Sequence, residues 1–102
     1  MANVKVSWVL PTTRKSGKPL LVEQIAFAFI EMSADLGANF GPVGEFPPDV
    51  LETTVTELEP GEWVFRGSVQ DKAGKVSGTV EARIVVEDTS PPSDLQLTLT
   101  LA

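Results

Sequence analysis

Carboxylates are the only abundant side chains in this sequence that could carry catalysis. The 102 residues include 14 Asp and Glu but neither His nor Cys. Without His and Cys, the sequence excludes Ser–His–Asp and Cys–His catalysis, zinc fingers, and haem or iron–sulfur ligation by the usual residues. Paired carboxylates could still hydrolyse glycosidic bonds. Here they fall mostly in turns and at the ends of predicted strands, so we expect this protein not to be an enzyme.

Three loop carboxylates could in principle bind calcium, because this cation prefers oxygen ligands. They are Asp35, Asp49 and Asp71. No run of residues resembles an EF-hand loop, and an Asp at a turn commonly bonds to nearby backbone. We therefore expect Asp35 and Asp71 to form turns, and we expect no metal ion and no cofactor.

The charged residues are segregated along the chain, whose net charge is −6. Residues 1–20 carry four basic side chains and no acidic one, whereas residues 21–62 carry nine acidic and no basic one. Arg14, Lys15 and Lys18 could contact an acidic face of a neighbouring protein, or they could simply be solvated. An acidic chain with three clustered bases and no interleaved aromatic residues predicts no nucleic-acid binding.

Six segments are predicted to be strands. They cover residues 3–10, 22–32, 39–46, 50–57, 62–70 and 76–87. Most of them alternate between apolar and polar residues, which is typical of half-buried strands. Turn signals separate them, and this spacing predicts an all-β, antiparallel β-sandwich. Residues 22–32 are apolar on both faces, so the register of this strand stays open; a helix competes there, but the Phe and Ile content favours a strand.

The alternation also predicts which side chains form the core. We expect these to be Val6, Trp8, Leu58, Trp63, Phe65, Val80 and Ile84. Phe27 and Phe29 share one face of the 22–32 strand, where they could belong to the core or form an adhesive patch.

A leucine-rich segment follows this predicted sandwich. Residues 88–93 are a connector whose two prolines cannot lie in a central strand. Residues 94–102 then alternate regularly, with four leucines on one face. These are Leu95, Leu97, Leu99 and Leu101. We expect a C-terminal strand.

Residues 3–87 resemble a fibronectin type III domain, a Greek-key β-sandwich. Val4 to Trp8 is similar to the family's B strand, and residues 30–37 are similar to the end of its strand C. Residues 58–66 are similar to the EF corner and strand F, and residues 71–77 are similar to the FG hairpin. The sequence departs from the family in having Trp63 where a corner Tyr is usual. It also begins at strand B, without an N-terminal A strand, while residues 91–98 resemble the opening of a following repeat.

The A-like segment has three possible placements. It could fold back beside its own last strand, fill its own A position, or insert into a neighbour. The connector spans at most ~20 Å, whereas an eight-residue strand is about 26 Å long, so filling its own A position would stretch the connector. Donation to a neighbour would cover an exposed edge and an apolar groove without that stretch.

Short chains of this kind resemble small proteins of tailed bacteriophages. That resemblance implies a non-enzymatic virion component, either a capsid decoration protein or a tail or fibre accessory, that associates with itself or with other virion proteins. No signal peptide or membrane span is evident, so we expect assembly in the host cytoplasm and no membrane partner. The alternatives are an adhesion module that binds a glycan or receptor through loops 11–19, 44–49 and 71–75, and a fragment of a larger surface protein.

Overall fold

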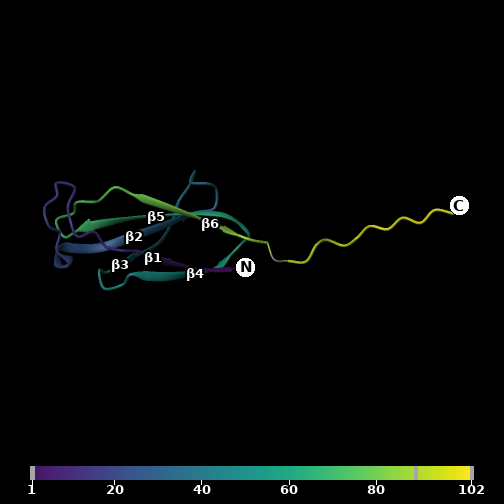
Figure 1. The fold of residues 1–102 in the computed structure, drawn as a ribbon, viewed down its shortest axis with the longest axis horizontal. Coiled ribbons are helices and arrows are strands. Elements are labelled where there is room, and N and C mark those ends of the chain that lie inside the picture. The colour runs from purple at the N-terminus through teal and green to yellow at the C-terminus, as the bar shows by residue number, and fades with distance from the viewer. Residues whose placement is uncertain (1, 89, 102) are drawn as a thin grey trace.

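A computed structural model describes residues 2–88 and 90–101 and contains six strands (Figure 1). The strands are β1 (Ala2–Ser7), β2 (Ile25–Ser33), β3 (Gly41–Phe46), β4 (Glu52–Leu58), β5 (Gly61–Asp71) and β6 (Val80–Val86). One turn of 3-10 helix, η1 (Val22–Gln24), precedes β2. The chain is therefore all-β, as its alternating segments predicted.

The strands form two antiparallel sheets of unequal width. One sheet pairs β1 with β4, and the other has the order β3-β2-β5-β6. The connections from β1 to β2, from β3 to β4 and from β4 to β5 each cross between the sheets. This arrangement is a β-sandwich in which two strands face four.

The structure defines the register of β2. Ala28 and Ile30 are buried against the two-stranded sheet, whereas Phe27 and Phe29 are half-buried on the opposite face. On that outer face Phe29 lies opposite Ser68 of β5 in the ladder. The two phenylalanines are therefore outside the sandwich core.

The main core contains one or two side chains from most strands. Val4, Ile30, Leu58, Phe65 and Val86 form its buried cluster. Val6, Trp8 and Trp63 are partly buried and pack against this cluster.

Two expected core residues lie outside it. Val80 is 75% exposed and Ile84 is 40% exposed, so the prediction that they are buried is wrong for this chain. The physical reason is that the two-stranded sheet covers the end of β6 at Val86, whereas no strand in the described part of the chain covers Val80 to Ile84.

Leu58 points into the core because a β-bulge just before it shifts the alternation of side chains in β4 by one residue. Val55 already faces the core, so strict alternation would turn Leu58 outward. Glu57 has a φ of 61°, and the register with β1 shifts between Ala2 and Val4. This bulge inserts one residue and returns Leu58 to the core, where it is 3% exposed.

A second buried cluster lies on the outer face of the four-stranded sheet. Val64 is fully buried there, although alternation with Phe65 directs it away from the sandwich core. It lies opposite Ser33, whose hydroxyl accepts a hydrogen bond from the Gly37 backbone N–H at 3.0 Å. The turn after β2 thus folds onto this face.

The corner between β4 and β5 is closed by an indole. Trp63 Nε1 donates a hydrogen bond to the Glu59 carbonyl at 2.9 Å. A Tyr at this position would make the corner bond with its hydroxyl, whereas here the indole N–H makes it. The bond ties the start of β5 to the preceding turn.

The C-terminal segment makes no strand in the described structure. Residues 90–101 extend away from the sandwich, and the four leucines are 80–99% exposed (Figure 1). The expected strand over 94–102 is thus not formed within a single chain (residue 102 lies outside the described residues), because its apolar face finds no partner strand there. Neither placement within its own molecule is adopted.

Candidate functional site

The inner face of β6 is an uncovered part of the core surface. Cross-strand neighbours share a face, and β6 pairs Ile84 with Trp63, Ala82 with Phe65 and Val80 with Gly67. Because Phe65 points into the core, Val80, Ala82 and Ile84 point to the same side. All three are exposed, since the opposing sheet ends at β1 and reaches no further.

A groove of about 470 Å³ opens at one end of this uncovered side, beside Val80. Its walls are largely apolar and come from the residues that follow β1, from β2, from β5 and from the start of β6; they include Trp8, Val9, Leu10, Ile30, Val69 and Val80. Val9 is 94% exposed there. The groove and the uncovered face therefore offer an apolar surface to an extended apolar segment.

One polar atom of the groove is left without a partner. Among the described residues, Trp8 Nε1 is the buried side-chain donor that has no hydrogen bond. A buried donor without an acceptor is costly, by about 1–3 kcal/mol. The atom itself is buried, so this cost belongs to the packing around Trp8 and not to a contact that a segment in the groove would make.

The open edge of β1 leads up to the groove, because Trp8 and Val9 directly follow this strand and line the groove. The Trp8 N–H donates to the carbonyl of Leu51, the residue before β4, at 3.0 Å, and in an antiparallel ladder the backbone groups of alternate residues point the same way. The backbone N–H and C=O of Val6 therefore also point toward β4. The backbone groups of Lys5 and Ser7 point the other way, to the open side of the strand. Within the described chain β1 pairs only with β4, so these outward groups form an open strand edge.

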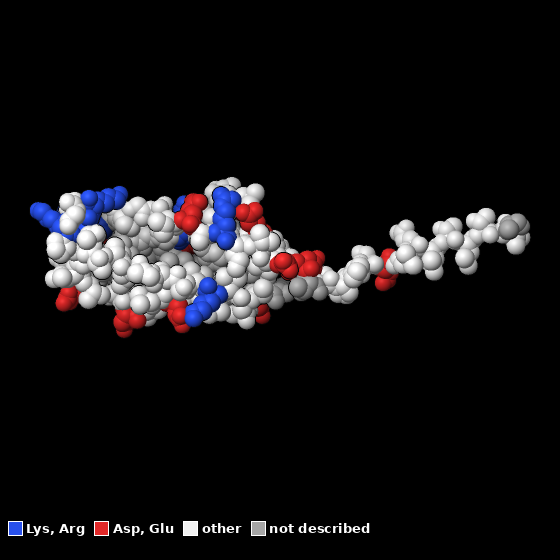
Figure 2. Space-filling model, viewed as in Figure 1, with Lys and Arg blue, Asp and Glu red and all other residues white. Residues whose placement is uncertain are grey.

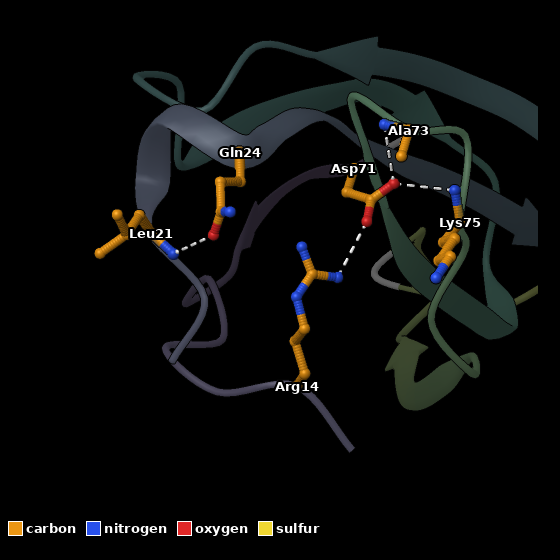
Figure 3. A network of polar contacts seen from close by, with 6 residues as sticks. All are labelled: Arg14, Leu21, Gln24, Asp71, Ala73 and Lys75. Atoms are coloured by element: carbon orange, nitrogen blue, oxygen red, sulfur yellow. Dashed lines mark hydrogen bonds and ion pairs between the residues drawn. The ribbon is translucent and has the colours of Figure 1, made fainter. Parts of the chain in front are cut away.

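The basic loop is held against the β5–β6 hairpin by an ion pair (Figure 3). Arg14 Nη1 donates to Asp71 Oδ2 at 2.9 Å, and the Asp71 side chain is 8% exposed. Asp71 Oδ1 accepts from the backbone N–H groups of Ala73 and Lys75. The Arg14 hydrogen bond and those backbone bonds hold the pKa of Asp71 below its usual value. Asp71 is thus a turn former, as expected, and also an anchor for the loop.

Lys15 and Lys18 remain exposed on that loop, and Lys15 lines the groove. The hairpin at the same end adds Lys72 and Lys75, which are also exposed. Figure 2 shows these basic side chains gathered at the end of the molecule opposite the C-terminal segment, and acidic side chains at the root of that segment. Basic side chains therefore gather on one side of that end, and acidic side chains gather at the root of the C-terminal segment.

The acidic turn after β2 has a structural role. Asp35 accepts hydrogen bonds from the Ser33 hydroxyl and from the backbone N–H and side-chain amide of Asn39. The Ser33 bond, followed by those from Asn39, lowers the pKa of Asp35 from 3.8 to about 2. In the described part of the chain, no group of three His, Cys, Asp or Glu side chains is placed to hold a metal ion.

The candidate site residues predicted from the sequence do not all lie together in the structure. Phe27 and Phe29 lie on the outer face of β2, away from the groove, while Arg14 is engaged by Asp71. The leucines of the C-terminal segment and the groove are both exposed and both unpartnered. The sequence predicted an apolar groove that a donated strand would cover, but it did not identify the residues that line the groove.

No helix in the described residues is long and apolar enough to cross a membrane. The chain matches no known protein family and no curated protein.

Proposed function

We propose that this protein is a non-enzymatic structural component of a phage virion that links neighbouring subunits through its C-terminal strand. It would decorate a capsid or accompany a tail or fibre, docking on a repeating lattice. The relationship to fibronectin type III domains is part of the same proposal. Residues 3–87 supply the sandwich, and residues 94–102 supply the linking strand.

The observation that carries this proposal is the exposed C-terminal segment. Four leucines alternate on one face of an extended chain and touch nothing in their own molecule. Large apolar patches left in water favour association with another surface. A protein that acts by holding neighbours together needs such a segment, and it needs no catalytic residues.

Light scattering coupled to size exclusion, over a wide range of concentration, tests the proposal. We expect the mass to rise with concentration above the 10.9 kDa of one chain. A chain ending at Ser90 should stay monomeric, and Leu97→Asp should weaken association while residues 3–87 remain folded by circular dichroism. A full-length chain that stays at 10.9 kDa at high concentration would contradict self-association.

An adhesion module is the second candidate, and the loops supply its support. The Arg14–Asp71 pair fixes loop 11–19 against loop 71–75, and β3 ends at Phe46, which packs on Trp8 near the same end of the sandwich. Three loops thus meet at one basic end, as in a recognition surface. Binding of the monomer to immobilised glycans, without self-association, would favour this candidate.

A further inference from the structure

We infer that the open edge of β1 and the uncovered inner face of β6, with the groove at Trp8 and Val80 as its entrance, form the acceptor site for the C-terminal segment of a second copy of this chain, which adds a strand antiparallel to β1. This inference rests on the proposed self-association and specifies its site, direction and register. The site is incomplete without the second copy, because the described residues of one chain leave both the edge and the apolar wall uncovered.

The first support is the match between the open edge and the incoming segment. The outward backbone groups of β1 offer donors and acceptors to an added strand, which is the usual basis of strand addition. Leu95 to Leu101 is about 23 Å long when extended, and the six residues of β1 extend about 20 Å. One added strand therefore covers this edge.

The second support is the match between side chains. A strand beside β1 in the two-stranded sheet lies opposite β6, and its alternate side chains face Val80, Ala82 and Ile84. The four leucines of the segment have this alternation, with Gln96, Thr98 and Thr100 left for the solvent face. Two exposed apolar faces of one molecule thus complement each other.

The third support is charge, and it sets the direction. A strand antiparallel to β1 enters beside the end of β1, where Trp8 and Val80 line the same groove and Lys15 lies next to it. The entering segment carries Glu87, Asp88 and Asp94 at its root. The acidic root of one copy therefore meets the basic end of the next, as Figure 2 shows for the two ends of a single copy.

This direction makes the contact head to tail. Each segment leaves its own molecule beyond the end of β6, opposite the basic end at which it enters the next molecule (Figures 1 and 2). The donor and acceptor surfaces differ, so the contact repeats and builds a chain or a closed ring. Leu95 then lies near Val80, and Leu99, four residues further along, lies near Ile84.

Cysteine cross-linking tests the register, and the cysteine-free chain makes each introduced pair unique. Chains with Leu95→Cys are mixed with chains carrying Val80→Cys, and Leu99→Cys with Ile84→Cys. Because facing sheets lie about 10 Å apart, too far for a disulfide, a thiol-specific bismaleimide of about that length is added. We expect cross-linked dimers from both mixtures. The crossed mixtures, Leu95→Cys with Ile84→Cys and Leu99→Cys with Val80→Cys, should link poorly. Efficient linking of the crossed mixtures alone would overturn the direction.

Substitutions in β6 test the groove with a matched control. Val80→Asp places a charge in the acceptor groove, whereas Val85→Asp changes an equally exposed valine on the opposite face of the same strand. We expect Val80→Asp to weaken association roughly ten- to a hundredfold and Val85→Asp to leave it unchanged. Equal effects of the two substitutions would overturn the assignment of the groove.

Mixing a donor variant with an acceptor variant distinguishes failure of this inference from failure of the proposed function. Leu97→Asp spoils the donor and Val80→Asp spoils the acceptor, so each variant alone should be largely monomeric and the mixture should form one-to-one dimers. If wild-type chains associate but the mixture stays monomeric, self-association stands and the groove is not the acceptor. If wild-type chains do not associate at all, both the proposed function and this inference fail.

Discussion

Asp71 joins two loops through three hydrogen bonds to its side chain. Its two oxygens hold the basic loop and the β5–β6 hairpin together. We expect Asp71→Asn to keep the backbone bonds through Oδ1 but to lose the Arg14 ion pair, lowering the thermal midpoint by several degrees. Differential scanning calorimetry measures this loss. Glu62→Gln, which breaks the exposed 3.3 Å pair with Arg83, is the control and should change little.

The lowered pKa values of Asp35 and Asp71 make stability depend on acid. A carboxylate with a lowered folded-state pKa stabilises the fold fully above its unfolded value, and that contribution is lost as the pH falls through the folded value. For Asp35 this range is from pH 3.8 down to about 2. We expect the thermal midpoint to fall across this range, and to fall less in Asp35→Asn. An unchanged slope in that variant would contradict the role of the Ser33 bond.

Trp63 is predicted to stabilise the corner through one hydrogen bond. Trp63→Phe keeps an aromatic ring but removes the donor to the Glu59 carbonyl. We expect a loss of about 1–2 kcal/mol in the free energy of unfolding, measured with urea, which combines the bond and a reduced apolar area. A variant as stable as the wild type would mean that water replaces the indole donor without cost.

At the scale of elements, the bulge in β4 determines which side Leu58 faces. Glu57 has a left-handed backbone that glycine accepts and a β-branched residue resists. We expect Glu57→Val to be less stable than Glu57→Gly by about 1–2 kcal/mol in urea unfolding. Equal stabilities would show that β4 relaxes to a regular strand, which would turn Leu58 outward.

At the scale of the whole molecule, separated charges should steer assembly. The basic end carries Lys15 and Lys18, and the opposite end carries the acidic root of the C-terminal segment. Complementary charge mainly raises the rate of encounter, and salt screens it. We expect the double variant Lys15→Glu, Lys18→Glu to associate more slowly at low salt, measured by stopped-flow scattering. The difference from wild type should shrink at high salt, and a difference that persists would mean that the lysines make short-range contacts.

The sequence by itself determined the elements and several local features. Alternation with period two marked most of the strands, because half-buried strands need one apolar face. Turn chemistry was also local: Gly74 has a φ of 87° in the hairpin, and Asp35 and Asp71 bond to backbone within four residues. Such features depend on neighbours along the chain, which the sequence displays directly.

Tertiary structure decided which faces are covered. Alternation shows that Val80 and Ile84 share a face, but their exposure depends on how many strands the opposing sheet contains. Val64 was placed outward by alternation and is nevertheless buried, because a turn folds over it. For the four leucines, alternation identified the apolar face, while the absence of a partner within the described chain leaves that face open to another molecule. Burial is a property of two surfaces in contact, and a single strand's sequence describes only one of them.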